Sequence, residues 1–163
     1  MRVYLGLGSN LGNGVAQIRR ALDALGGRGC RVLRTSSFYR TEPAGVRDQP
    51  WFTNCVAEAE TELSPRALLR TAKAIESLMG RRRKAPGSPR PLDIDILLYE
   101  DEVVHLPSLE IPHPRMSERR FVLIPLKELA PKLRHPNLKK TASEMLRETA
   151  DRSRVNRMRQ DES

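Results

Sequence analysis

The alternation of apolar and polar positions predicts three strands in the N-terminal part of the chain. Residues 2–8, RVYLGLG, form a largely apolar run that the turn-rich SNLGN ends. Residues 30–40 and 51–62 alternate well enough to be strands, and the loop TEPAGVRDQP separates them. We therefore expect one strand before the first turn and two more strands after the first helix.

Two helices are predicted by apolar side chains that recur at intervals of three and four residues. The spacing holds in two sets, Val15, Ile18, Leu22 and Leu25, and Leu68, Ala72, Ile75 and Met79. Gly26 and Gly27 end the first helix, because glycine favours the C-terminal end of a helix. Ser64 followed by Pro65 is typical of a helix start, and Gly80 ends the second helix.

The second half of the chain begins with a predicted strand at residues 92–99, followed by a short strand at Val103 and Val104. A proline-flanked loop, EIPHPRMSERR, leads into a helical segment over about residues 117–129 that Pro125 starts or kinks. The sequence TASE, residues 141–144, fits a capping box for a last helix. The polar end, residues 151–163, is expected to fray.

The order of these elements predicts the fold class. Strand, helix, two strands, helix and strand, with a helical C-terminal part, indicate an α+β fold in which helices pack on an antiparallel sheet in the ferredoxin-like arrangement. At 163 residues the chain has the length of one domain with a sizeable core. We therefore expect a single domain.

The composition is that of a globular protein, with 39% apolar and 30% charged residues and no apolar stretch near the length of a membrane span. The N-terminal MRVYLGLGSN lacks the long apolar segment of a signal peptide. Cys30 and Cys55 stand in strand-like runs without metal-type spacing, so we expect buried thiols and no disulfide. A cytoplasmic protein that does not bind membranes is expected.

The net charge of +9 is unevenly distributed. Residues 81–90, RRRKAPGSPR, carry five positive charges and no acid, and residues 132–163 carry nine basic and five acidic side chains. These two segments account for the whole excess. A basic loop in a balanced body indicates a local anionic partner such as a polyphosphate.

Two aspartates, Asp93 and Asp95, interrupt an otherwise apolar predicted strand. Side chains at positions i and i+2 share one face of a strand, so the carboxylates project together while Ile94, Ile96 and Leu98 face the core. Such a pair suits two metal ions held between them and a substrate, and hard oxygen ligands favour Mg²⁺. Taken alone, the pair is equally well explained by a half-exposed strand with two acids on its wet face.

Basic side chains flank the aspartates on both sides and favour the metal site. They are Arg81, Arg82, Arg83, Lys84 and Arg90 upstream, and His113, Arg115, Arg119 and Arg120 downstream. Guanidinium groups beside a carboxylate pair match a site for a metal polyphosphate and phosphoryl transfer. The upstream run, rich in proline, glycine and serine, forms a loop that could close as a lid. The glycines of GLGSNLG, residues 6–12, match neither the dinucleotide fingerprint nor the P-loop.

Four motifs resemble a known family. They are YLGLGSNLGN, SSFYRTEPAG with DQPWFTN, PRPLDIDILLY, and IPHPRMSERRFVLIPLKELAP. In this order, over residues 3 to about 131, they are similar to the 6-hydroxymethyl-7,8-dihydropterin pyrophosphokinases of folate biosynthesis. The resemblance implies transfer of pyrophosphate from ATP to the pterin hydroxymethyl group, with release of AMP. It also implies a pyrophosphokinase domain over residues 1–135, with residues 136–163 as a C-terminal helix and polar tail, part of that domain or partly disordered.

The resemblance further implies roles for individual residues. The two Mg²⁺ ions would be held by Asp93 and Asp95, and the implied catalytic residues are Arg81, Arg83, Arg90, Asp93 and Asp95. The implied ATP-binding residues are Glu76, Arg83, Arg90, Ile96, His113 and Arg119. The implied pterin-binding residues are Thr41, Ala44, Phe52, Asn54 and Phe121. Of these, Phe52 and Phe121 would sandwich the pterin ring, and Asn54 would hydrogen-bond it.

The chain departs from the family pattern just before the aspartate strand. The family's Arg-Trp-Gly-Pro-Arg run is APGSPR here, without the tryptophan. The expected partners are the small molecules ATP and dihydropterin, with no nucleic acid, and the expected state is a monomer.

Two alternative functions use the same features. A basic ferredoxin-like sheet could bind RNA, but such modules stack bases on sheet aromatics, and this chain is only 4% aromatic. A metal-dependent nuclease would use the two aspartates but would leave the TEPAG and DQPWFTN segments without a role.

Overall fold

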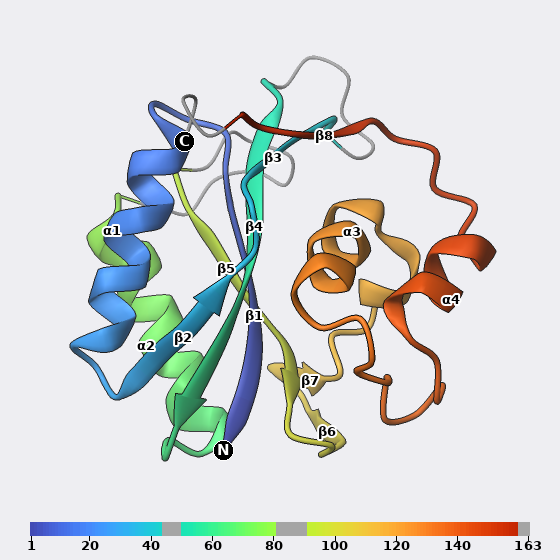
Figure 1. Cartoon of the computed structure of the whole chain (residues 1–163). Helices are drawn as coiled ribbons and strands as arrows, with labels where there is room; N and C mark the ends of the chain where they lie inside the picture. Colours follow the sequence, from blue (N-terminus) through green and yellow to red (C-terminus); the bar gives the residue numbers. More distant parts are fainter. Residues whose placement is uncertain (44–49, 81–90, 160–163) are drawn as a thin grey trace.

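A computed structural model describes residues 1–43, 50–80 and 91–159 of the chain. Its main sheet has six strands, all antiparallel where they pair, in the order β5-β1-β4-β3-β8, with β2 also paired to β4 (Figure 1). The strands are β1 (Arg2–Ser9), β2 (Cys30–Thr35), β3 (Tyr39–Thr41), β4 (Phe52–Thr61), β5 (Asp93–Tyr99) and β8 (Val155–Arg157). A separate hairpin consists of β6 (Val104–Leu106) and β7 (Leu109–Ile111). The predicted α+β class is confirmed.

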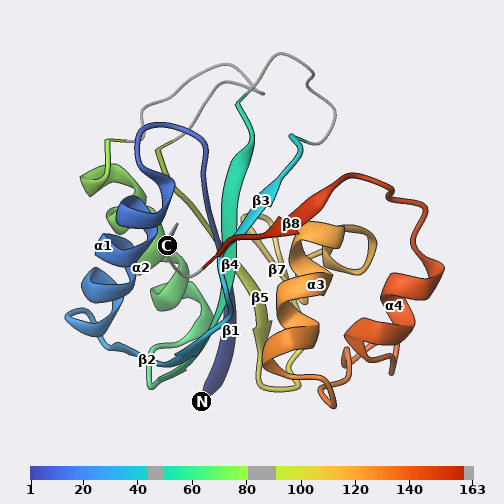
Figure 2. The same cartoon turned by 45° about the horizontal axis from the view of Figure 1, so that its top comes forward.

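Helices cover both faces of this sheet, as Figures 1 and 2 show. On one face lie α1 (Gly14–Gly26) and α2 (Pro65–Leu78), and on the other lie α3 (Arg120–Leu129) and α4 (Ala142–Glu148), with the short 3₁₀ helix η1 (Met116–Glu118) before α3. The predicted starts of α2 and α4 are confirmed, because Ser64 and Thr141 each accept a backbone N–H of the first turn. Glu144 completes the capping box of α4.

Each face of the sheet carries its own apolar cluster. The cluster under α1 and α2 includes Leu5, Ile18 and Ile75, and the cluster under α3 and α4 includes Val56 and Leu123. Cys30 and Cys55 are buried free thiols, as expected, and burial raises the pKa of Cys30 to about 11. None of the helices in the described residues is long and apolar enough to span a membrane.

Three elements of the structure differ from the sequence prediction. The single strand expected at 30–40 is two strands, β2 and β3, because the chain breaks at Ser36, whose hydroxyl accepts the Val56 N–H. Strand β7 lies where a loop was expected, and β8 lies in the polar end that was expected to fray.

Strand β5 departs from simple alternation near its end. Ile94 and Ile96 pack in the cluster under α1 and α2, but Leu98 packs with its neighbour Leu97 on the opposite face. The prediction that Leu98 shares the face of Ile94 and Ile96 is therefore wrong. The cause is an irregularity in the β1–β5 register between Tyr4 and Leu5. Beyond it, the side chains at the end of β5 no longer keep the alternation of Ile94 and Ile96.

The buried carboxylate of Glu58, on β4, links the strands β1 and β2 on either side of it. Glu58, 4% exposed, accepts hydrogen bonds from the Tyr4 hydroxyl at 2.6 Å, from Arg2 at 3.0 Å and from Arg34 at 2.8 Å. Burial by itself favours the neutral acid, but these three donors outweigh it and lower the pKa of Glu58 to about 2. Arg34 also donates to the Leu129 carbonyl, so the network fastens the end of α3 to the sheet.

Replacing Glu58 with glutamine is expected to lower the free energy of unfolding by about 2 kcal/mol at pH 7, because the buried donors lose their charged acceptor. The ionised carboxylate stabilises the fold fully above the ordinary pKa of glutamate and less as the pH falls towards 2. Denaturant unfolding from pH 7 to pH 3 should therefore show the difference from the wild type shrinking in acid. Glu60→Gln, which affects the exposed Arg31–Glu60 pair, is the control. An equal, pH-independent loss in both variants would contradict this account.

Candidate active site

One cavity of about 740 Å³ brings together residues from distant parts of the sequence. Its walls are β1, β4 and β5 of the sheet, part of α2, the β6–β7 hairpin and the segment that leads into α3. Ten of the site residues expected from the sequence line it: Thr41, Phe52, Asn54, Glu76, Asp93, Asp95, Ile96, His113, Arg119 and Phe121. The other four, Ala44, Arg81, Arg83 and Arg90, lie outside the described residues.

The two aspartates lie on β5, at one edge of the sheet, and both face this cavity. Their partners on β1 are glycines, since Gly8 pairs with Asp93 and Gly6 with Asp95. Because a glycine has no side chain, Leu97 can pack over Gly6 and the Asn54 amide can lie over Gly8. The Asp95 side chain is 45% exposed, which leaves its oxygens accessible from the cavity.

Glu76, on α2, holds the strand between the two aspartates. Its carboxylate accepts the backbone N–H of Ile94 at 2.8 Å and lies 3.9 Å from the Lys73 ammonium. The Glu76 side chain is only 5% exposed, so this contact is made in the interior. The contact fixes the backbone from which Asp93 and Asp95 project. The pattern of residues in the sequence did not predict it.

Three basic side chains, those of His113, Arg115 and Arg119, line the same cavity as the aspartates. The backbone N–H of His113 donates to the Leu97 carbonyl, which ties the segment to β5. His113 Nδ1 accepts the Arg115 N–H at 3.3 Å, and its Nε2 lies 4.0 Å from an Asp95 carboxylate oxygen. Arg119 lies beside them and also lines the cavity. The guanidinium groups of Arg115 and Arg119 form a cationic wall in the same cavity as the two carboxylates.

The electrostatics of this wall favour an anionic ligand. Burial lowers the pKa of His113, and the charges of Arg119 and Arg115 lower it further, against the opposing effect of Asp95. Burial, and then the nearby Arg115, lower the pKa of Arg119. Within the described part of the chain, the buried Nε of Arg119 has no hydrogen-bond partner. A bound polyanion would relieve the mutual repulsion and accept hydrogen bonds from these donors.

Two aromatic and two buried polar side chains also line the cavity, and we call the part that Phe52, Phe121, Asn54 and Thr41 line the aromatic slot. Phe52, from β4, and Phe121, from the first turn of α3, both line it. Asn54 donates from Nδ2 to the Thr41 hydroxyl at 2.6 Å, and both residues are buried. A Cβ at Gly8 would lie 2.4 Å from Asn54 Oδ1, so only glycine lets the amide lie against β1. The slot therefore offers an oriented amide beside aromatic surfaces.

Some cavity residues escaped the sequence prediction. Gly6 and Gly8 were judged only against nucleotide fingerprints, although their spacing of two in a strand places both on one face. Arg115 was noted as a basic neighbour but was not counted among the site residues. The hairpin residues Leu106 to Glu110 close the cavity from the side, and nothing in their own sequence indicated it.

Comparison with known proteins gives one consistent result. A sequence model of 7,8-dihydro-6-hydroxymethylpterin-pyrophosphokinase (HPPK) matches residues 4–131. The chain is 45% identical over 133 residues to a 2-amino-4-hydroxy-6-hydroxymethyldihydropteridine pyrophosphokinase of Methylorubrum extorquens, covering 81% of this chain and 84% of that protein. It is 42% identical over 153 residues to the protein of that name from Haemophilus influenzae, covering 93% and 95%.

A solved structure supports the fold independently of the sequence. A Plasmodium falciparum HPPK-DHPS superposes with a TM-score of 0.70 at 18% identity and covers 90% of this chain. The chain spans only 43% of that solved protein, so the similarity concerns one part of a longer chain.

Proposed function

The chain belongs to the 7,8-dihydro-6-hydroxymethylpterin-pyrophosphokinase family, and from this premise we propose how its residues hold the two substrates. The enzyme transfers the pyrophosphoryl group of ATP to the hydroxymethyl oxygen of 6-hydroxymethyl-7,8-dihydropterin, a step of folate biosynthesis that leaves AMP. The observation that carries the proposal is that one cavity joins a carboxylate pair, a cationic wall and an aromatic slot.

Asp93 and Asp95 would hold two Mg²⁺ ions together with the triphosphate. The described residues contain no cluster of three or more His, Cys, Asp or Glu side chains that could bind a metal by themselves. Two carboxylates nevertheless fit Mg²⁺, because this ion is commonly bound by one or two carboxylates plus substrate phosphates. When bound, the ions supply positive charge on the phosphate oxygens and align them with the attacking hydroxyl.

His113 and Arg119 contact the phosphates beside the aspartates. Phosphoryl-type transfer depends mainly on positioning and on neutralising charge, so these fixed donors add to what the two carboxylates contribute. Arg81, Arg83 and Arg90, outside the described residues, are proposed to add contacts along the phosphates. A strong general base is not required, which agrees with a site built from carboxylates and guanidinium groups.

The nucleoside end of ATP lies between α2 and the β6–β7 hairpin. This end of the cavity is lined by apolar side chains, among them Leu69, Ile96 and Leu109, with Lys73 and Glu76 beside them. Apolar side chains with a few polar groups are what a purine and ribose need. The proposed order along the cavity is therefore nucleoside, triphosphate over the aspartates, and pterin.

The pterin lies in the aromatic slot. Phe52 and Phe121 contact the two faces of the ring, and Asn54, held by Thr41, pairs with its amide-like edge. Thr41 and Ala44, the latter outside the described residues, contribute the remaining edge contacts. Asn54 and Asp93 both pair with Gly8 in the sheet, so this placement sets the hydroxymethyl group towards the aspartate pair.

The RNA-binding alternative fits the cavity poorly. An RNA module needs an open sheet face with exposed aromatics and basic residues. Here α3 and α4 pack on one side of the sheet around Val56 and Leu97, and the carboxylate pair would repel a phosphodiester chain. The pyrophosphokinase activity explains both the basic side chains and the carboxylate pair, and RNA binding does not.

The direct test is to incubate the purified protein with ATP, Mg²⁺ and 6-hydroxymethyl-7,8-dihydropterin and to separate the nucleotide products. We expect AMP in a one-to-one ratio with pyrophosphorylated pterin, and no AMP when the pterin or the metal is omitted. Formation of ADP, or hydrolysis of ATP that does not depend on the pterin, would contradict the proposed arrangement of substrates.

A further inference from the structure

We infer that the C-terminal segment 149–158 is a positioning element for the pterin slot, and that Arg154 is its main positioning residue. The inference rests on the pterin site proposed above. The segment lies beyond residue 131, where the family sequence model ends. It runs along the outside of the slot and connects the two elements that carry Phe121 and Thr41.

The first half of the segment fixes the start of α3. The Asp151 carboxylate accepts the backbone N–H of Arg120, the first residue of the helix, at 2.9 Å. The residue at the helix N-cap, Arg119, makes no side-chain capping bond, so this carboxylate, 31 residues along the chain, acts as the cap. Ser153 accepts from Arg120 Nε through its carbonyl at 3.0 Å.

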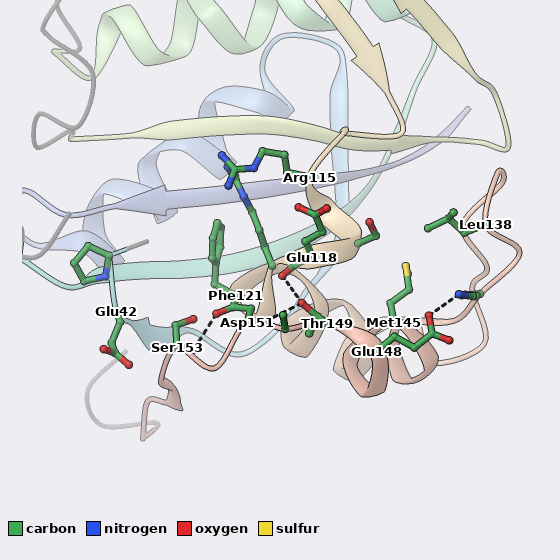
Figure 3. A pocket seen from close by; sticks show the side chains of 15 residues that line it. Glu42, Arg115, Glu118, Phe121, Leu138, Met145, Glu148, Thr149, Asp151 and Ser153 are labelled. Carbon is green, nitrogen blue, oxygen red and sulfur yellow. Dashed lines mark hydrogen bonds and ion pairs between the residues drawn. The ribbon is translucent and has the colours of Figure 1, made fainter. Parts of the chain in front are cut away.

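Thr149 adds a further attachment, since its hydroxyl donates to the Glu118 carbonyl at 2.7 Å. Figure 3 shows Asp151 and Ser153 next to Phe121, with Thr149 joined to Glu118 by a dashed line. Phe121 directly follows Arg120, and it lies in the wall shared by the cavity of about 740 Å³ and a neighbouring one of about 720 Å³. The segment therefore sets where this phenylalanine stands.

The second half of the segment fixes the opposite wall. Strand β8 pairs with β3, with Val155 opposite Thr41 and Arg157 opposite Tyr39. Without β8, the three-residue strand β3 would be the edge of the sheet, held only by β4. Thr41 is the residue that orients Asn54, so this pairing supports the polar base of the slot.

Arg154 contacts two residues at the slot, Glu42 and Trp51. Its backbone N–H donates to the Glu42 carboxylate, its carbonyl accepts the Glu42 N–H at 3.1 Å, and its Nε lies 3.3 Å from the same carboxylate. Its guanidinium lies 5.2 Å from the centre of the Trp51 ring. Glu42 lines the cavity, and Trp51 is followed directly by Phe52. Arg154 therefore ties Glu42 through its backbone and side chain, and Trp51 through its side chain alone.

The side-chain contacts of Arg154 contribute little to overall stability. The Arg154 side chain is 72% exposed, and exposed ion pairs and cation–π contacts are each weak. Their loss would leave the backbone bonds of β8, and those between Arg154 and Glu42, in place. It would release the Trp51 ring and remove one contact of the Glu42 carboxylate, so fewer molecules would hold the arrangement that receives the ring. Binding affinity falls in proportion to the fraction of molecules in the competent arrangement.

The test measures Arg154→Ala by calorimetric titration with the dihydropterin and with a non-hydrolysable ATP analogue plus Mg²⁺. We expect the Kd for the pterin to rise about fivefold, with the Kd for the nucleotide and the melting temperature nearly unchanged, and Arg154→Lys to recover part of the loss. Arg31→Ala, which removes an exposed Arg–Glu pair on β2, is the matched control and should change neither affinity.

Three outcomes would overturn the inference: unchanged pterin affinity in Arg154→Ala, equal loss of pterin and nucleotide affinity, or the same loss in Arg31→Ala. A wrong assignment of the pterin site itself would give a different result. In that case Phe121→Ala would bind the pterin as well as the wild type does, whatever Arg154→Ala does.

Discussion

Replacing Asp95 with asparagine is expected to lower kcat by about 10³-fold while the protein stays folded, because a group that stabilises charge in the transition state is lost from a preorganised site. Asn keeps the size of the side chain but has one neutral oxygen in place of a shared negative charge. Asp95 is half exposed and lines the cavity, so the isosteric change leaves the apolar core as it is. Steady-state kinetics with saturating pterin and varied Mg²⁺, together with the thermal melting curve, measure both effects.

Asp101→Asn is the matched control for this variant. Asp101 is an exposed acid in the turn after β5, at the other end of the same strand. The Asp101→Asn variant should retain the wild-type kcat. A near-normal rate in Asp95→Asn would show that the carboxylate pair belongs to a solvated strand face and has no part in the reaction.

Replacing Asn54 with alanine is expected to weaken pterin binding by about 10²-fold, because the ring edge would face buried groups that cannot pair with it. Asn54 is buried and held by the Thr41 hydroxyl, and Gly8 leaves just enough room for its amide. The nucleotide end of the cavity is unaffected by this change. The measurement is the Kd for the dihydropterin and, separately, the Kd for the ATP analogue.

Thr53→Ala provides the comparison on the same strand. The Thr53 side chain lies next to Gly14, where α1 begins, and does not line the cavity. This variant should bind the pterin normally. Comparable weakening in both variants would mean that the loss reflects a disturbed β4, and the assignment of Asn54 to the pterin edge would then be wrong.

The sequence predicted most of the elements because their signals are local. Helices α1 and α2 follow from apolar spacing and from the residues at their ends, and the common face of Asp93 and Asp95 follows from the two-residue period of a strand. Three signals were not local. The turn at Ser36 depends on β4, the face of Leu98 depends on a register shift in β1, and β8 depends on an edge that only β3 supplies.

The site shows the same division. The types and order of the residues predicted that Asp93, Asp95, His113 and Arg119 belong to one site. The structure places all four in one cavity. The support behind them could not be predicted from spacing. Glu76 acts through a backbone N–H of β5, and the cap of α3 comes from Asp151 in the C-terminal segment. Such contacts join residues that only the folded chain brings together.

The most direct test of the central claim is to count bound metal ions at the aspartates. Mn²⁺, which is paramagnetic and replaces Mg²⁺ in sites of this kind, can be titrated by electron paramagnetic resonance in the presence of a non-hydrolysable ATP analogue. We predict two bound ions per wild-type chain with the analogue, none bound tightly without it, and fewer in Asp95→Asn. The same count in Asp95→Asn as in the wild type would contradict the claim that this carboxylate holds the metal and its triphosphate.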